Sequence, residues 1–371
     1  MSDFYKNYGG WEIELETKPD FDEALRRVYA WYEGEMDGRP PIRFSRHNAD
    51  YELRDWGGRT WTDIKDRWFD TEYHVDSFID SLPRRSFLAE TFPIFWPNLG
   101  PNVFAACYGI PYEFGEVTAW TESTLTPREA LGLTLDWRSG YVKKLDEMTD
   151  YAAERSAGKY LIGYTDLHPG IDWAAAATGM DNLLLGLYDD PENVKLLARK
   201  TDDDYLRFFE RYDEKAKRVG SMSVAWMGIP SFVSVNHPSC DVANMFSPEH
   251  FEEFVYDGLV YQCEYFEHNV FHMDGKQLAR HTDIILTLPR LHGVQWVHGV
   301  GDDAPLLQWV PYIKRRQSSG KGVVIDVLPE ELPQIMEQLD PKGLFLCIPA
   351  EDEEHERFLI RQIERWALGK R

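Results

Sequence analysis

The sequence predicts an α/β protein built as a closed (β/α)8 barrel (TIM barrel), preceded by an N-terminal helical extension. Two observations favour this fold class. Short apolar segments alternate with helical patterns, and eight of these segments can be counted as strands, each followed by helix. The chain has 371 residues, a length that such barrels commonly reach as one domain. We expect the extension at residues 1–38 and the barrel at residues 39–371.

The extension contains one predicted helix, residues 20–35. Asp20 is its capping residue. Apolar side chains follow at helical spacing, namely Leu25, Val28, Tyr29 and Tyr32. Residues 46–63, after the first strand, are polar and rich in turn formers, so we interpret them as an active-site loop or an insertion.

The elements of the barrel follow in chain order. The predicted strands are residues 42–44, 92–96, 159–164, 221–226, 270–274, 293–297, 322–327 and 343–347. The predicted helices are residues 126–155, 171–187, 191–219, 247–266, 277–286, 305–317, 330–338 and 352–368. Pro127, Pro191 and Pro248 stand in first helical turns, where a missing N–H costs nothing. An open doubly wound sheet is the alternative, but no Gly-rich phosphate loop supports it.

Composition excludes several classes of protein. Hydrophobic residues make up 43% of the chain, so global disorder is excluded. The net charge of -23 disfavours nucleic acid as a partner, because binding to phosphates depends on Lys and Arg. The N-terminus has no signal-peptide pattern, and no apolar run approaches membrane-spanning length. Four widely spaced cysteines fit a reducing compartment. We therefore expect a cytoplasmic protein that does not enter a membrane.

The candidate site follows from the fold, because barrel active sites lie at the carboxyl ends of the strands. In residues 270–274, side chains two apart share one face of a strand, so His272 and Asp274 project together. We expect Asp166, His272 and Arg46 to act in catalysis. Residues expected to bind a small-molecule substrate are Trp96, Asn98, His168, Trp226, Asp241, Gln295 and Trp296; His237 and Asp326 also fall near strand ends.

Three of these strand-end residues, His272, Asp274 and Cys347, are candidate zinc ligands. Zinc accepts imidazole, carboxylate and thiolate, and three protein ligands leave its fourth position for a substrate. Other interpretations stay open. Cys347 would also fit as a small buried hydrophobe, Asp274 as a helix cap, and His272 with Asp274 as a hydrogen-bonded pair. The tryptophans would also fit as core or rim packing.

Several segments carry a resemblance to a known family. The segments SCD at 239–241, FSPEHF at 246–251, FHMDG at 271–275 and GVQWVHG at 293–299, with His281 and Gly320-Lys321, resemble the uroporphyrinogen decarboxylase superfamily. Its members include cobalamin-linked methyltransferases. The resemblance extends over most of the chain after about residue 85. It implies a (β/α)8 barrel with the site at the carboxyl ends of the strands.

Two chemistries compete within this resemblance. The decarboxylases bind the carboxylates of a tetrapyrrole with two arginines of an N-terminal motif. Here Arg46 is kept, but Asp50 stands in place of the second arginine, and an acid repels a polyanion. The methyltransferases hold zinc with a His-x-Cys pair near the fifth strand and a Cys after the last strand. His272 and Cys347 match these places, and Asp274 replaces the first Cys.

The leading hypothesis is a zinc-dependent methyltransferase. It would move a methyl group between a small methylated substrate and a thiol, or the cobalamin carried by a partner corrinoid protein. The alternative enzyme is a metal-free decarboxylase or lyase acting on a carboxylated substrate, with Arg46 and His272 binding or protonating it. A binding barrel without catalysis is a third class. Barrels of this kind are commonly dimers, so a homodimer is a further expectation.

Overall fold

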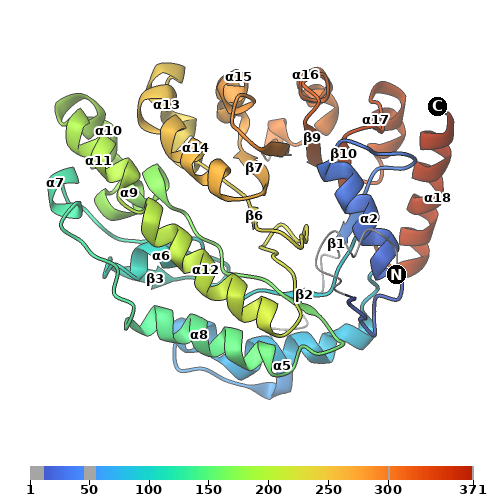
Figure 1. Cartoon of the computed structure of the whole chain (residues 1–371), viewed down its shortest axis with the longest axis horizontal. Coiled ribbons are helices and arrows are strands. Elements are labelled where there is room, and N and C mark those ends of the chain that lie inside the picture. The colour runs from blue at the N-terminus through green and yellow to red at the C-terminus, as the bar shows by residue number, and fades with distance from the viewer. Residues whose placement is uncertain (1–11, 46–55, 300, 370–371) are drawn as a thin grey trace.

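The structure, a computed structural model, describes residues 12–45, 56–299 and 301–369. Its centre is an all-parallel sheet of six strands in the order β1-β10-β9-β8-β7-β6. The strands are β1 (Ile42–Ser45), β6 (Val235–Asn236), β7 (His268–Asp274), β8 (Leu291–Val297), β9 (Gly322–Asp326) and β10 (Leu344–Pro349). The sheet is curled and helices flank it, so the architecture is an α/β half-barrel (Figure 1).

The second half of the predicted alternation is confirmed. β7, β8, β9 and β10 coincide with the last four predicted strands to within two residues. Their residues are mostly buried on both faces, as expected for a parallel sheet covered by helices. The covering helices form an outer arc (Figure 1) and are α13 (Pro248–Phe254), α14 (Tyr256–Tyr265), α15 (Thr282–Ile285), α16 (Val310–Gln317), α17 (Leu332–Gln338) and α18 (Glu353–Gly369).

The first half has shorter strands outside the main sheet. β2 (Ile94–Phe95) and β5 (Leu161–Ile162) form a parallel pair, and β3 (Tyr112–Phe114) with β4 (Ala119–Thr121) forms an antiparallel pair. Backbone hydrogen bonds join Glu90 N to Ile42 O (2.8 Å) and Tyr164 N to Val224 O (2.9 Å). The first bond connects β1 to the segment before β2, and the second connects the end of β5 to residues 221–226, but the described residues form no continuous eight-stranded sheet.

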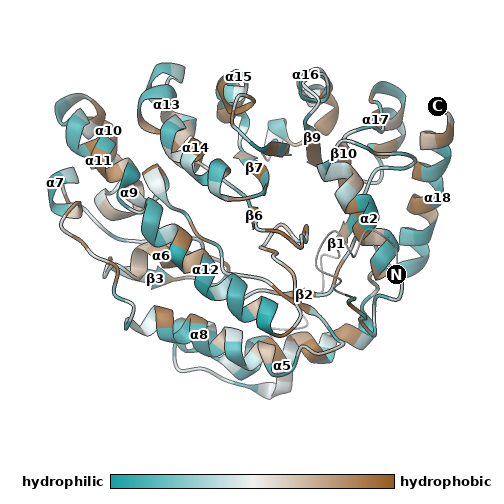
Figure 2. Ribbon diagram, in the orientation of Figure 1, coloured by the Kyte–Doolittle hydropathy of each residue, from teal (hydrophilic) through white to brown (hydrophobic). Residues whose placement is uncertain are grey.

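The helices of the first half are mostly short. They are α2 (Phe21–Tyr32), α4 (Ile64–Trp68), α5 (Thr71–Ser81), α6 (Val103–Ala106), α7 (Pro127–Ala130), α8 (Gly140–Ala153), α9 (Gly170–Thr178), α10 (Met180–Asp189), α11 (Pro191–Arg199) and α12 (Asp202–Arg218). Figure 2 shows hydrophilic and hydrophobic sides on α8 and α12, as expected for helices at a surface. None of the described helices is long and apolar enough to cross a lipid bilayer.

Several predicted elements are wrong in detail, among them the helices at 171–187 and 247–266, which divide at Gly179 and Val255. The strand at 221–226 is absent; Ser223 makes only an isolated bridge to Ser231, and the strand next to β7 is β6. The helix at 126–155 divides into α7 and α8, because Ser139 caps a new helix by accepting the N–H of Val142 (3.2 Å). The helix at 191–219 divides into α11 and α12 at residues 200–201.

Helix α2, in the predicted extension, packs against the amino ends of the strands. Its four predicted apolar residues are all buried. The indole of Trp31 lies against Gly293 of β8 and Gly322 of β9, and donates a hydrogen bond to Gly343 O (2.9 Å). A Cβ at Gly322 would lie 2.5 Å from the Trp31 ring, so glycine is needed for this close approach. The carboxyl ends of these strands lie at the opposite end.

A buried carboxylate fastens α2 to the start of the sheet. Glu90 is fully buried and accepts hydrogen bonds from Arg27 Nη1 (2.5 Å), Arg39 Nη1 (2.7 Å) and Ile42 N (2.7 Å). A buried charge is tolerated when it is paired and hydrogen-bonded in this way. Glu90 therefore joins the helix, the segment before β1 and β1 itself.

Candidate functional site

The candidate site begins where β7 ends. Residues 268–274 form one continuous strand, so the predicted shared face of His272 and Asp274 follows. Gly275, with a φ of 89°, lets the chain turn away directly after Asp274. Asn244 Nδ2 donates to the backbone oxygens of Asp241 (3.0 Å) and Asp274 (2.9 Å). The loop after β6 is thereby tied to the end of β7.

This tie brings Asp241 beside His272 and Asp274. One potential ligand atom from each of the three side chains lies within 4.8 Å of the other two. We call these residues the Asp-His-Asp cluster. His272 is half-buried and Asp274 is exposed, so the cluster is open to solvent on one side. It combines one imidazole and two carboxylates from separate parts of the chain.

The orientation of His272 is fixed by Gln295 on β8. Gln295 faces His272 across the β7–β8 ladder, and its Oε1 lies 2.7 Å from His272 Nδ1. Since an amide oxygen only accepts hydrogen bonds, Nδ1 is the donor in this contact and Nε2 is the ring nitrogen left for other partners. Imidazole ligands of metals are oriented in this way. Gln295 was predicted to bind substrate, and in the structure its side chain contacts His272.

The charges of the cluster favour a cation. Burial and the nearby negative charge of Asp241 raise the pKa of Asp274, and His272 opposes this rise. Asp241 Oδ1 is buried and has no hydrogen-bond partner among the described residues. Zinc binds imidazole nitrogen and carboxylate oxygen, and three such ligands leave one position open. The residues of the cluster therefore fit a divalent metal ion such as zinc.

Asp166 and His168 are the other predicted pair, and His168 lies close to Asp241. His168 Nε2 lies 3.1 Å from Asp166 Oδ2. Burial alone would lower the pKa of His168, but the negative charges of Asp166, Asp172 and Asp241 outweigh burial and raise the pKa to about 10. His168 is therefore a cation at neutral pH. It belongs to a second group of ligand-type atoms, with Asp172 and Asp241.

Asp172, on α9, positions the loop that carries Asp241. Its two carboxylate oxygens accept the backbone N–H groups of Asp241 and Val242, both at 3.0 Å. Burial and the charge of Asp241 raise the pKa of Asp172 to about 6. Because His168 is a cation at neutral pH and a protonated imidazole has no free lone pair, the Asp-His-Asp cluster is the better metal site. Asp172 was not among the predicted site residues, since its helix gave no sign of this contact.

Cys347 lies on β10, towards the carboxyl end of that strand. It is level with Arg43 of β1 and Asp326 of β9 in the ladder. Burial raises the pKa of its thiol to about 11, and the positive charge of Arg43 opposes this rise. Among the described residues Cys347 joins neither group of ligand-type atoms. Of the predicted zinc ligands, the structure brings together His272 and Asp274, with Asp241 as the third residue.

His237 follows β6 directly and is a buried histidine near His272. Its ring packs edge-on against Trp226 at 5.7 Å between centroids, and Trp226 packs edge-on against His272 at 4.9 Å. Burial lowers the pKa of His237 to about 3, and the charge of His272 adds to this effect. His237 is therefore neutral. A hydrogen bond with the backbone of Val270 opposes the decrease but does not outweigh burial.

Comparison with known proteins supports the fold. No protein-family model and no curated protein matches the sequence. The chain is similar in structure to a methyltransferase from Methanosarcina mazei. The TM-score is 0.60 at 12% sequence identity, and the match covers 88% of this chain and 92% of the other. At this identity the likeness shows a shared fold over nearly the whole chain.

The remaining predicted residues lie apart from the cluster. Trp296 points to the helix side of the sheet, where its ring contacts Trp309 (5.0 Å) and Tyr312 (4.3 Å). Trp96 and Asn98 line a separate cavity of about 260 Å³ beside α4 and α5, together with Trp68 and other residues. Arg46 lies outside the described residues. Arg43, three residues earlier on β1, donates a hydrogen bond to Met227 O.

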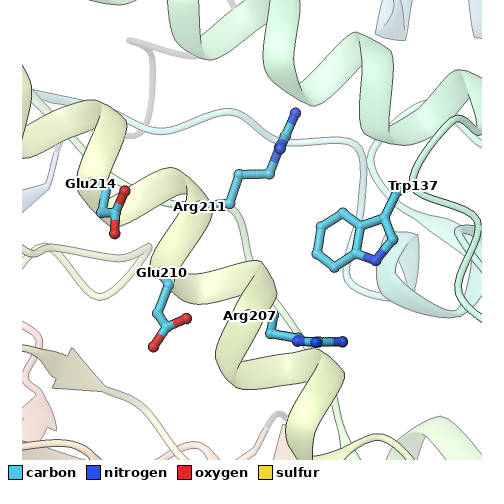
Figure 3. Close-up of a pocket in the computed structure, with 5 residues that line it drawn as sticks. All are labelled: Trp137, Arg207, Glu210, Arg211 and Glu214. Carbon is cyan, nitrogen blue, oxygen red and sulfur yellow. The ribbon is translucent and has the colours of Figure 1, made fainter.

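Another cavity, of about 470 Å³, lies on the outer helix layer. Figure 3 shows Arg207 and Arg211 projecting from α12 towards Trp137, with Glu210 and Glu214 on the same helix. Arg211 is paired with Asp146 at 2.6 Å. None of the predicted site residues lines this cavity.

Proposed function

We propose that this chain is a metal-dependent methyltransferase, and that the Asp-His-Asp cluster holds its metal, zinc in the first place. The grouping of Asp241, His272 and Asp274 carries the proposal. Two further points support it. The resemblance to cobalamin-linked methyltransferases involves the segments around 239–241 and 271–275, and the similar solved structure is named a methyltransferase. We also propose that the fold is a closed eight-stranded barrel. The hydrogen bonds from Glu90 N to Ile42 O and from Tyr164 N to Val224 O support this.

The ligand set differs from the one first expected from the sequence. Asp241 replaces Cys347 as the third protein ligand, so all the ligand atoms are nitrogen or oxygen. Such a set suits zinc and also harder divalent ions. Cys347, whose thiol is buried and protonated, then packs as a small residue beside Arg43.

Each neighbouring residue has a task in this proposal. When bound, zinc would polarise the leaving heteroatom of a methyl donor or lower the pKa of an acceptor thiol. Gln295 keeps His272 Nε2 free to bind. Asp172 holds the loop of Asp241. His168, held by Asp166, places its positive charge next to that loop, and the Trp226 ring packs edge-on against His272.

The methyl group would pass between a small substrate and a thiol, or the cobalamin of a corrinoid protein. The four cysteines are free and buried, in keeping with a reducing, cytoplasmic setting for such a partner. A direct assay supplies methylcobalamin and 2-mercaptoethanol and follows the loss of methylcobalamin by its absorbance. Zinc-dependent loss above the rate without enzyme is expected. Conversion of a carboxylated substrate that survives chelation would instead favour the lyase.

Metal analysis tests the ligand set. Protein purified without chelator should contain about one divalent ion per chain. Asp241→Asn and His272→Ala should lose most of it, whereas Cys347→Ser should keep it. Trp296→Phe, which changes only the helix side of the sheet, is the matched control. Wild-type protein that binds no divalent ion, even after incubation with zinc, would overturn the proposal; loss in Cys347→Ser with retention in Asp241→Asn would overturn this ligand set.

A further inference from the structure

Asp326 is an exposed carboxylate at the carboxyl end of β9. It is the last residue of the strand, and the four residues before it are buried. The protein around the carboxyl group still raises its pKa through desolvation, and the charges of Arg43, His298 and His272 oppose this rise and favour the carboxylate form. None of these influences is a hydrogen bond to the carboxyl group. Among the described residues, the charge of Asp326 therefore has positive groups nearby but is not neutralised by direct contact.

The ladder directs Asp326 to the same side of the sheet as the Asp-His-Asp cluster. Gln295, whose side chain contacts His272, is paired with Val324 of β9. Paired residues of parallel strands point to the same side of the sheet, and so do side chains two residues apart on one strand. Val324 and Asp326 therefore face the side on which His272 and Asp274 lie. The effect of His272 on the pKa of Asp326 fits this placement.

Asp326 lies two strands away from the end of β7. In the sheet order, β8 stands between β7 and β9. Asp274 is paired with Val297, which comes two residues after Gln295, so Asp274 and Asp326 stand at the same level of the ladder. Because neighbouring strands lie about 4.8 Å apart, the Cα atoms of Asp274 and Asp326 are roughly 10 Å apart. This separation allows a small molecule to reach the cluster with one end and Asp326 with the other.

The surroundings of Asp326 favour a cation over an anion. Arg43, the nearby arginine, is half-buried and already donates to Met227 O, and a hydrogen bond also joins it to Cys347. An anionic group would be repelled by Asp326, whereas an ammonium group would find a carboxylate that accepts no hydrogen bond from the described side chains. The net charge of -23 also attracts cations towards the chain as a whole.

We propose that Asp326 is a specificity-determining residue, which binds an ammonium group of the substrate that reacts at the Asp-His-Asp cluster. The assignment rests on the proposed methyl transfer and names a substrate class for it: a small thiol that carries an ammonium group a few bonds from the sulfur. A hydrogen bond between ammonium and carboxylate is about twice as strong as one between neutral groups. Asp326 therefore selects an aminothiol over the corresponding hydroxythiol.

The first test compares two acceptor thiols of similar size, with methylcobalamin as donor. Cysteamine carries an ammonium group, and 2-mercaptoethanol carries a hydroxyl in its place. The quantity measured is the ratio of their kcat/KM values. Asp326→Asn keeps the size of the side chain and removes its charge, so this ratio should fall about tenfold relative to the wild type. Because both thiols are measured on each enzyme, differences in their own reactivity cancel. An unchanged ratio in Asp326→Asn would overturn the proposal.

Asp283→Asn is the matched control. Asp283 lies on α15, where its side chain is 70% exposed and pairs with Arg315, so the variant changes the net charge equally on the helix side of the sheet. This control should keep the wild-type ratio. Asp326→Asn should keep the wild-type Tm and zinc content, because Asp326 makes no side-chain hydrogen bond with the described residues and belongs to neither group of ligand-type atoms. An equal fall of the ratio in the control, or loss of zinc in Asp326→Asn, would overturn the proposal.

A binding measurement keeps the proposal testable if neither thiol is methylated, a result that counts against the proposed function alone. In calorimetric titrations of zinc-loaded protein, cysteamine should bind Asp326→Asn about tenfold more weakly than the wild type. The affinity for 2-mercaptoethanol should be the same in both proteins. Equal affinity of the two proteins for cysteamine, or no binding of cysteamine to the wild type, would overturn the role of Asp326.

Discussion

Gln295 offers a sharp test of how the metal site is built. Its Oε1 accepts the Nδ1 proton of His272 at 2.7 Å, and the side chain is only 4% exposed, so water cannot replace it. In Gln295→Leu, Nδ1 loses its acceptor and the proton is no longer held there. Loss of such a partner typically weakens metal affinity 10- to 100-fold, which corresponds to about 1.4–2.7 kcal/mol. We expect a decrease of that size for zinc.

The assay is a competition titration of zinc between the protein and a chromophoric chelator. Gln262→Leu is the matched control, because Gln262 is equally buried but faces Asn236 on the helix side of the sheet. Gln295→Glu gives a second, opposite prediction. A carboxylate in this position keeps the acceptor and raises the basicity of the imidazole, so zinc should bind at least as tightly as in the wild type. Unchanged affinity in Gln295→Leu, or an equal decrease in the Gln262 control, would refute the reasoning.

Two further predictions concern the scaffold. Glu90→Ala should lower the free energy of unfolding in urea by about 3–5 kcal/mol, because it removes the buried carboxylate that pairs with Arg39 and leaves that arginine only a 3.9 Å contact with the exposed Glu364. Glu23→Ala removes only the exposed partner of Arg27 and should cost less than about 1 kcal/mol. Burial and the charge of His292 lower the pKa of His268 from 6.5 to about 3. Between these two pH values the unfolded state binds one proton more than the folded state, so the free energy of unfolding falls as the pH drops from about 6.5 towards 3. The advantage of the wild type over His268→Gln should shrink over that range by at most about 1.4 kcal/mol per pH unit; a constant difference would contradict this pKa.

The second half of the fold could be predicted because its strands are long and buried on both faces. β7 to β10 are mostly buried strands of five to seven residues that alternate with helices, and this pattern is hard to misplace. In the first half, β2 and β5 have only two residues each, and residues 221–226 are held by hydrogen bonds without forming a strand. Such short pairings depend on tertiary contacts and leave a weak periodic signal.

The candidate site could be predicted only where its members are close in sequence. His272 and Asp274 share a strand, so period-two alternation places them together. Asp241 joins them through a loop held by Asp172 and Asn244, and no local sequence pattern predicts such long-range contacts. Trp296, predicted as a site residue, lies apart from the cluster because alternation turns it to the helix side, as the contact with Tyr312 shows.

Anomalous diffraction at the zinc absorption edge, on crystals of zinc-loaded protein, tests the central claim most directly. The account predicts one strong peak bounded by the carboxylates of Asp241 and Asp274 and by Nε2 of His272, with Cys347 outside the coordination sphere. A peak bound to Cys347 without Asp241, or the absence of any peak at the Asp-His-Asp cluster, would contradict it.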